Sequence, residues 1–157
     1  MTDKTSALLI FDEAMRWLRT NYQSYTFFVE RDLVWTMQTR IASLIRELGA
    51  DFRVSNDYAI EPGNRRSLCV DLAVLRETTI ELATEWKFEP SHRRIEIAPG
   101  KLPVCSWGPN GVRGDVDRIS HFVEKRRAQA GHAILVDEGG YFRGRPAHVG
   151  AEWVDWP

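Results

Sequence analysis

The stretch from Leu68 to Pro90 reads LCVDLAVLRETTIELATEWKFEP and contains two apolar runs separated by the polar residues 76–79. Each run is typical of a strand, and four residues suffice to turn the chain back so that the two strands pair. The first run carries Asp71, and the second carries Glu85 and Lys87. Because side chains alternate faces along a strand, Glu85 and Lys87 point to one side, and Asp71 can stand beside Glu85. Two carboxylates and an amine on one sheet face predict a functional site.

Size and composition indicate a single domain, residues 1–157, that is long enough to bury a core. The hydrophobic fraction of 43% and the charged fraction of 27% are ordinary for a soluble protein. No segment has the ~20 apolar residues of a membrane span, and no N-terminal run is long enough for a signal peptide. Cys69 and Cys105 lack metal-ligand spacing and favour reduced thiols. We therefore expect a cytoplasmic protein with no membrane partner.

The net charge of −1 argues against a strongly nucleic-acid-binding surface. Its distribution is less even, because residues 65–145 hold 14 basic against 11 acidic side chains, while residues 1–64 hold 7 against 9. The acids on the two strands thus lie in a mildly basic half of the chain. That setting is compatible with a substrate that carries phosphate groups.

The remaining patterns predict an extra N-terminal helix followed by helix, strand, strand, strand, helix and strand. The expected bounds are 6–20 and 26–48 for the first two helices, 51–60, 68–75 and 80–88 for three strands, and 115–130 and 132–136 for the last helix and strand. Asp115 or Asp117 is the expected cap of the last helix. Strands joined by short loops favour an antiparallel meander. Residues 141–157 are expected to pack back as an irregular C-terminal tail.

Glu30 stands near the start of the second expected helix, four residues before Val34 and on the same apolar side. Burying an unpaired charge is costly, so an acid at this position is a candidate partner of the acids on the strands. A simpler interpretation is that Glu30 only favours the positive end of the helix dipole.

Prolines and glycines interrupt residues 89–115, and so long a connection in a compact domain is usually a functional loop or an insertion. A short strand over residues 94–98 is the one element expected there. Trp107 with nearby arginines would suit a stacked base and backbone phosphates, or it would instead close a small satellite core. The candidate substrate-binding cations are Arg93, Arg94, Lys101 and Arg113.

The acids offer the oxygen ligands that a hard divalent cation such as Mg²⁺ prefers, and Mn²⁺ would serve as well. Asp71 and Glu85 would bind the cation directly, the backbone carbonyl of Trp86 would add a third ligand, and Glu30 would reach it through water. Such a site suits phosphodiester hydrolysis, because the metal activates the attacking water and stabilises charge on the phosphate. Lys87 would hold or polarise that water.

This arrangement resembles the PD-(D/E)xK nuclease superfamily, which has the restriction-endonuclease-like fold. The resemblance covers about residues 26–137 and is carried by Glu30, Val70-Asp71 and Glu85-Trp86-Lys87. It implies an α/β protein with an αβββαβ core, in which a mixed central sheet is flanked by helices. Two features depart from the family pattern: valine at 70 replaces the usual proline, and residues 89–115 are an insertion relative to a minimal core.

The resemblance implies Mg²⁺-dependent hydrolysis of DNA, with catalytic roles for Asp71, Glu85 and Lys87 and an accessory role for Glu30. A homodimer would suit cleavage of both strands. Two rival functions would use the same residues. One is a catalytically inactive nuclease-like domain that binds a protein or a nucleic acid as a regulatory module, which the nearly neutral charge favours. The other is a hydrolase that uses the same carboxylates on a nucleotide.

The individual residues also have interpretations without chemistry. A bare Glu-x-Lys triplet carries little information, since it occurs by chance in most proteins. Asp71 and Lys87 would form a cross-strand salt bridge at a sheet edge, and Glu85 would be a polar position facing solvent. Glu81 shares a face with Glu85 and would replace it as a ligand if the strand register shifted by two.

Overall fold

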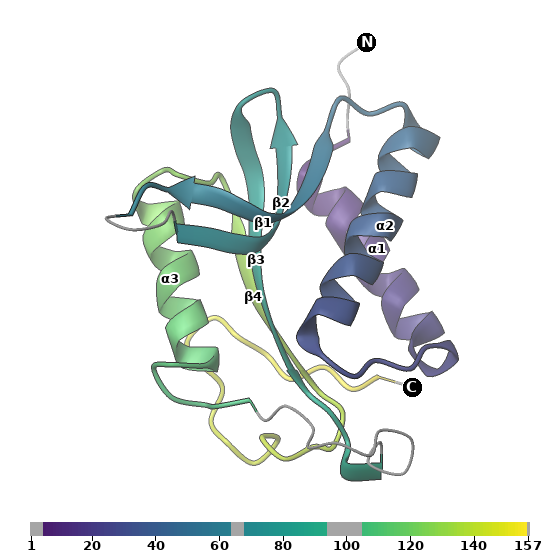
Figure 1. Ribbon diagram of the computed structural model, residues 1–157, viewed down its shortest axis with the longest axis vertical. Coiled ribbons are helices and arrows are strands. Elements are labelled where there is room, and N and C mark those ends of the chain that lie inside the picture. The colour runs from purple at the N-terminus through teal and green to yellow at the C-terminus, as the bar shows by residue number, and fades with distance from the viewer. Residues whose placement is uncertain (1–4, 64–67, 94–104, 157) are drawn as a thin grey trace.

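A mixed four-stranded sheet with helices on both faces organises the protein (Figure 1). The computed structural model describes residues 5–63, 68–93 and 105–156. Helices α1 (Ala7–Asn21) and α2 (Glu30–Leu48) cover one face, and α3 (Val112–Glu124) covers the other. This confirms the expected α/β class with a mixed sheet and an extra N-terminal helix.

The strands are β1 (Arg53–Glu61), β2 (Leu68–Arg76), β3 (Thr79–Glu89) and β4 (Gly131–Asp137), and they lie in the order β1-β2-β3-β4. The first three form the expected antiparallel meander, whereas β4 is parallel to β3. A parallel pair needs a crossover connection, and α3 lies on that connection. The crossover brings α3 onto the sheet face beside β3 and β4.

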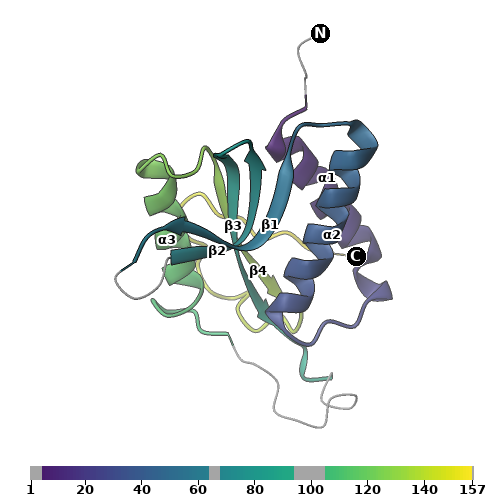
Figure 2. The same ribbon diagram turned by 45° about the horizontal axis from the view of Figure 1, so that its top comes forward.

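The sheet splits into two strand pairs, β1 with β2 and β3 with β4, beyond the point where β2 and β3 stop pairing. Pairing of β2 with β3 runs from Arg76–Thr79 to Leu72–Thr84, and beyond that point β2 continues with β1 while β3 continues with β4. Figures 1 and 2 show the two strand pairs diverging in this way. Asp71 and Glu85 are the next residues on each strand, so both acids lie at the point of divergence.

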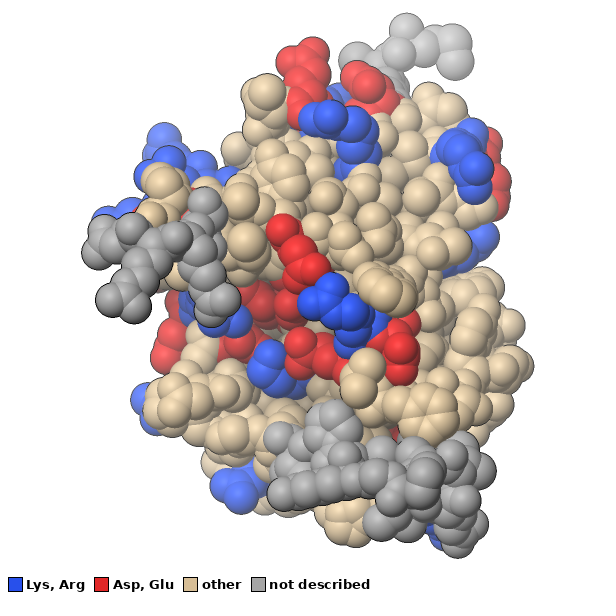
Figure 3. Space-filling view, in the orientation of Figure 1, with Lys and Arg blue, Asp and Glu red and all other residues tan. Residues whose placement is uncertain are grey.

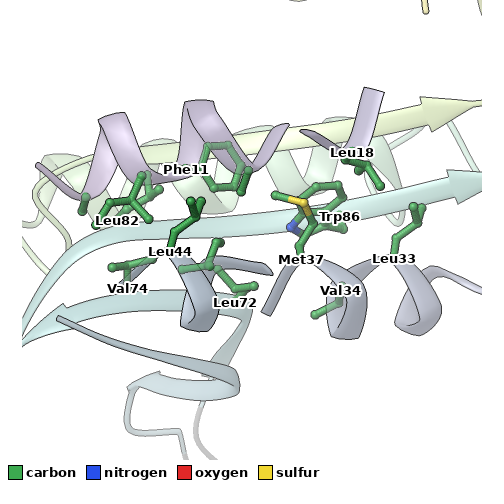
Figure 4. Close-up of a cluster of buried hydrophobic side chains, with 14 of the residues drawn as sticks. Phe11, Leu18, Leu33, Val34, Met37, Leu44, Leu72, Val74, Leu82 and Trp86 are labelled. Carbon is green, nitrogen blue, oxygen red and sulfur yellow. The ribbon is translucent and has the colours of Figure 1, made fainter. Parts of the chain in front are cut away.

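The main core lies between the sheet and helices α1 and α2 (Figure 4). Trp86 is fully buried in it, with its ring in a T-shaped contact with Phe11 and its indole N–H donating to Thr84 Oγ1 at 2.9 Å. Because neighbours on a strand point to opposite faces, burial of Trp86 on this side turns Glu85 and Lys87 to the face covered by α3. The packing of one tryptophan thus orients the two charged side chains beside it.

Helix α2 begins at Glu30, four residues later than expected. The carboxylate of Asp32 accepts the backbone amides of Phe28 and Val29, at 2.8 and 3.0 Å, and holds the chain before the helix in an extended conformation. Glu30 is therefore the first residue of the helix, at the end that faces the sheet division.

Helix α3 begins at Val112 and ends at Glu124, so the prediction that Asp115 or Asp117 caps it is wrong. The cap position is Gly111, and the first helical amide, of Val112, donates to the carbonyl of Ser106 at 2.9 Å. Asp115 consequently lies one turn inside the helix, where its side chain is free to point at the sheet.

The C-terminal segment after β4 has neither helix nor strand as far as residue 156, as expected, and Trp156 packs against the ring of Tyr22. Trp107 stacks with Phe142, His148 and Trp153, with ring centroids 5.3–6.2 Å apart. These contacts match the satellite core rather than a free base-stacking platform. The strand expected over residues 94–98 lies outside the described residues. Among the described helices, none is long and apolar enough to cross a membrane.

Candidate functional site

Asp71 stands where β2 leaves β3 and takes over a hydrogen bond of the sheet. Its Oδ2 accepts the backbone N–H of Trp86 at 2.7 Å, in place of a carbonyl of the partner strand. Glu85 lies beside it on β3 and is only 2% exposed. Burial, together with the charge of Asp71, raises the pKa of Glu85 to about 8. Glu85 therefore holds its proton to a higher pH than an ordinary glutamate does.

Lys87 connects the strands of the site to α2 and α3. Its Nζ lies 3.2 Å from Glu30 Oε2, 3.0 Å from Asp115 Oδ2 and 3.0 Å from the carbonyl oxygen of Trp86. Burial acts to lower the pKa of Lys87, but the hydrogen bond to Asp115 and the charge of Glu30 outweigh it, so this pKa is raised. Lys87 is accordingly a cation throughout the neutral range.

Arg118 of α3 contacts two carboxylates of the site, those of Glu85 and Asp115. Its Nε lies 2.7 Å from Glu85 Oε1, and its terminal nitrogen lies 2.5 Å from Asp115 Oδ1, one turn earlier on the same helix. Asp115 is 4% exposed and thus bridges the two cations of the site, Lys87 and Arg118. Burial also raises the pKa of Asp115, against the opposing effect of Lys87.

The result is one connected set of charges from α2, β2, β3 and α3. At full ionisation its four carboxylates outnumber its two cations by two. Figure 3 shows acidic and basic side chains gathered in a hollow on this side of the molecule. In order of contact the members are Glu30, Lys87, Asp115, Arg118, Glu85 and Asp71.

Compared with family models, with curated proteins and with solved structures, the chain finds no match. The site has to be interpreted from its own geometry. The four site residues expected from the sequence lie together. Asp71 lies beside Glu85, and Lys87 follows Glu85 two residues later on β3. The Lys87 ammonium in turn contacts Glu30. Glu30 thus has a partner in the site, beyond any effect on the helix dipole.

Two of the interpretations without chemistry do not fit. Glu85 is buried, so it is no solvent-facing polar position, and Lys87 pairs with Glu30 and Asp115 rather than across the strands with Asp71. Glu81 lies toward the hairpin turn, 3.8 Å from Arg76, and the observed pairing of Leu72 with Thr84 excludes the shifted register.

Of the candidate substrate-binding cations, the two that the structure describes do not join the cluster. Arg93 is exposed in the turn after β3, and Arg113 is exposed on the first turn of α3. Within the described part of the chain, neither forms an ion pair with a carboxylate of the site. Arg94 and Lys101 lie outside the described residues.

Asp115 and Arg118 are site residues that the sequence interpretation missed. Asp115 shares a helical face with Ile119 and Phe122, at spacings of four and seven, and both of these are buried. Like Glu30, Asp115 is an acid on an apolar helix face, so the sequence does contain a signal for it. Arg118 carries no comparable signal, because a basic residue on α3 is ordinary.

The oxygen atoms at the point where β2 and β3 separate are of the type that a hard cation prefers as ligands. The carboxylates of Asp71 and Glu85 and the carbonyl of Trp86 offer only oxygen, which is what Mg²⁺ and Mn²⁺ prefer. Among the described residues, no three acidic, histidine or cysteine side chains are grouped so as to hold a metal ion.

Proposed function

We propose that the protein is a metal-dependent nuclease with the restriction-endonuclease-like fold, and that it hydrolyses phosphodiester bonds of DNA. One observation carries the proposal: Asp71 and Glu85 lie side by side where β2 and β3 separate, with Lys87 two residues further along β3. The order of elements from α2 to β4 and the position of Glu30 agree with the same family resemblance.

Asp71, Glu85 and the carbonyl of Trp86 are the residues that would hold Mg²⁺ or Mn²⁺. The metal would supply an activated water and stabilise negative charge on the phosphate. Lys87 keeps its proton, so it orients the attacking water and offsets charge on the phosphate instead of acting as a base. Asp115 and Glu30 hold the Lys87 ammonium in place for that role.

DNA as the substrate is supported by the family resemblance and by the excess of basic side chains in residues 65–145. The proposal includes a cytoplasmic location, in accord with the two cysteines, both of which are free thiols. It also includes a homodimer as the form that would cut both strands of a duplex.

The test is cleavage of supercoiled, linear, single-stranded and branched DNA with Mg²⁺ or Mn²⁺, by the wild type and by Asp71→Asn, Glu85→Gln and Lys87→Met. We expect cleavage by the wild type and a loss of about 10²–10⁴-fold in each variant. Asparagine is chosen at position 71 because it can still accept the Trp86 amide. Alanine would leave that buried N–H unpaired, at a cost of about 1–3 kcal/mol.

Glu81→Gln is the matched comparison, because Glu81 is on the same strand and pairs with Arg76 away from the site. It should cleave like the wild type. If wild-type protein leaves every DNA form intact with both metals, the nuclease proposal fails.

One observation favours the rival function of a catalytically inactive binding module. The carboxylates already have partners within the protein, above all Glu85 with Arg118 at 2.7 Å. In that case the network would serve only to join α2, β3 and α3. Calorimetric titration separates the two functions: no heat of binding with Mg²⁺ or Mn²⁺, in wild type as in Asp71→Asn, would support the inactive module.

A further inference from the structure

A cation of the protein itself lies on the carboxylate that the proposed function assigns to the metal. Arg118 Nε is 2.7 Å from Glu85 Oε1. The Glu85 side chain is 3% exposed and that of Arg118 is 40% exposed, so the guanidinium reaches Glu85 from the solvent side. An ion that binds Glu85 Oε1 has to take the place that Arg118 Nε occupies.

The presence of Arg118 has a clear electrostatic reason. Glu85 is buried beside a second carboxylate, Asp71, and two adjacent acids without a cation are costly to bury. The Lys87 ammonium is engaged with Glu30 and Asp115. The guanidinium of Arg118 is therefore the cation in contact with Glu85.

Arg118 also has an anchor that does not depend on Glu85. Its terminal nitrogen lies 2.5 Å from Asp115 Oδ1, and the Asp115 side chain is only 6% exposed. Residues three apart face each other on a helix, so this contact can persist whatever Glu85 binds. Arg118 can thus release Glu85 and remain at the mouth of the site.

We propose that Arg118 is an exchangeable counter-cation: its guanidinium pairs with the Glu85 carboxyl, and a divalent metal ion replaces it there while Asp115 retains the arginine nearby. The inference rests on the proposed function, because it assumes a metal site at Asp71 and Glu85. The physical basis is repulsion, since a divalent ion and a guanidinium cannot both stand against one carboxylate oxygen in a buried site. Arg118 consequently weakens metal binding and makes the metal-free site stable.

The test is calorimetric titration of the full chain with Mg²⁺ alone, at pH 9. Arg118→Gln should bind Mg²⁺ about tenfold more tightly than the wild type, because one positive charge has left the site. Arg118→Lys retains the charge and should stay within about threefold of the wild type. Arg127→Gln, an exposed arginine just after α3, removes the same charge outside the site and should leave the affinity unchanged.

Thermal unfolding supplies a second measurement. Arg118→Gln should lower the Tm of the metal-free protein, and Mg²⁺ should raise its Tm by more than it raises that of the wild type. A purely structural arginine would lower the Tm without any change in Mg²⁺ affinity, and that result overturns the inference.

The outcomes separate this inference from the function on which it rests. If the wild type cleaves DNA and binds Mg²⁺ with the same affinity as Arg118→Gln, the nuclease proposal holds and the exchange of Arg118 for metal is refuted. Binding of Mg²⁺ by Arg118→Gln and not by the wild type supports the exchange in its strongest form. Binding by neither protein overturns the metal site and the exchange together.

Discussion

Glu85 is the acid of the site that is most costly to ionise, as its raised pKa indicates. It is 2% exposed, it adjoins Asp71, and one cation, Arg118, offsets the two acids. Buried polar groups that depend on so few partners cluster at functional sites, where they are arranged for binding or for chemistry. The raised pKa of Glu85 is the measurable trace of that arrangement, and it has a consequence for stability.

The metal-free protein should lose stability as the pH rises from about 4.5 to 8. The pKa of Glu85 is about 8 in the folded protein against 4.5 for an ordinary glutamate, so the folded state holds an extra proton between these values. The free energy of unfolding therefore falls with rising pH over that window and levels off above it. The pKa values of Glu30 and Asp115 are raised too and act in the same direction.

Thermal unfolding in EDTA between pH 5 and 9 measures this loss. Glu85→Gln cannot ionise, so most of the slope should vanish, and the wild type should lose about 5 °C more than the variant between pH 5 and 8. Glu81→Gln is the control and should follow the wild type. Parallel Tm curves for wild type and Glu85→Gln would contradict the raised pKa.

At the level of elements, the strands were predictable because their patterns are local. The runs of β2 and β3 are bounded by polar residues, and the observed ends differ from the expected ones by at most one residue. The start of α2 was misplaced because Asp32 caps the helix through backbone amides, a contact that apolar spacing does not reveal. The helix-face argument still identified Glu30 correctly as a neighbour of the strand residues.

The position of α3 could not be predicted in the same way. Its contact with β3 depends on the parallel pairing of β3 with β4, which brings the crossover helix onto the sheet face. That pairing joins residues far apart in sequence, and no local pattern specifies it. Asp115 was therefore interpreted as a cap, and its contacts with Lys87 and Arg118 emerged only in three dimensions.

Gly131 sets the distance between α3 and the sheet. It is the first residue of β4, and a Cβ there would lie 2.6 Å from Ile119 Cγ2 and 3.3 Å from Val123 Cγ2, both on α3. Gly131→Ala should therefore push α3 outward, with a loss of about 1–3 kcal/mol in the free energy of unfolding. Cleavage should fall as well, because α3 carries the Asp115 that holds Lys87.

Denaturant unfolding and the cleavage assay measure the two effects. Gly144→Ala is the control, because an added Cβ there would meet nothing within 4 Å. It should stay within about 0.5 kcal/mol of the wild type. Equal stability of Gly131→Ala and the wild type would show that α3 has more freedom to shift than the close packing implies.

For the whole molecule, the balance of charge decides how a nucleic acid can approach. The chain has a net charge of −1, and the site holds an excess of two negative charges at full ionisation. A phosphate backbone is repelled by such a site unless a cation is bound there. On the proposed function, DNA binding should therefore depend on a divalent ion before any bond is cut.

Fluorescence anisotropy of a labelled duplex tests this dependence. Ca²⁺ accepts the same oxygen ligands as Mg²⁺ and serves as the added ion. The wild type should bind at least about fivefold more tightly in Ca²⁺ than in EDTA, because the ion cancels the local excess of negative charge. The double variant Asp71→Asn with Glu85→Gln removes both acids at the strand division, so it should bind well in EDTA and respond little to Ca²⁺. If the wild type binds equally in EDTA and Ca²⁺ while the double variant is unchanged from it, the carboxylates at the strand division do not govern access of the phosphate backbone, and the duplex docks elsewhere on the protein.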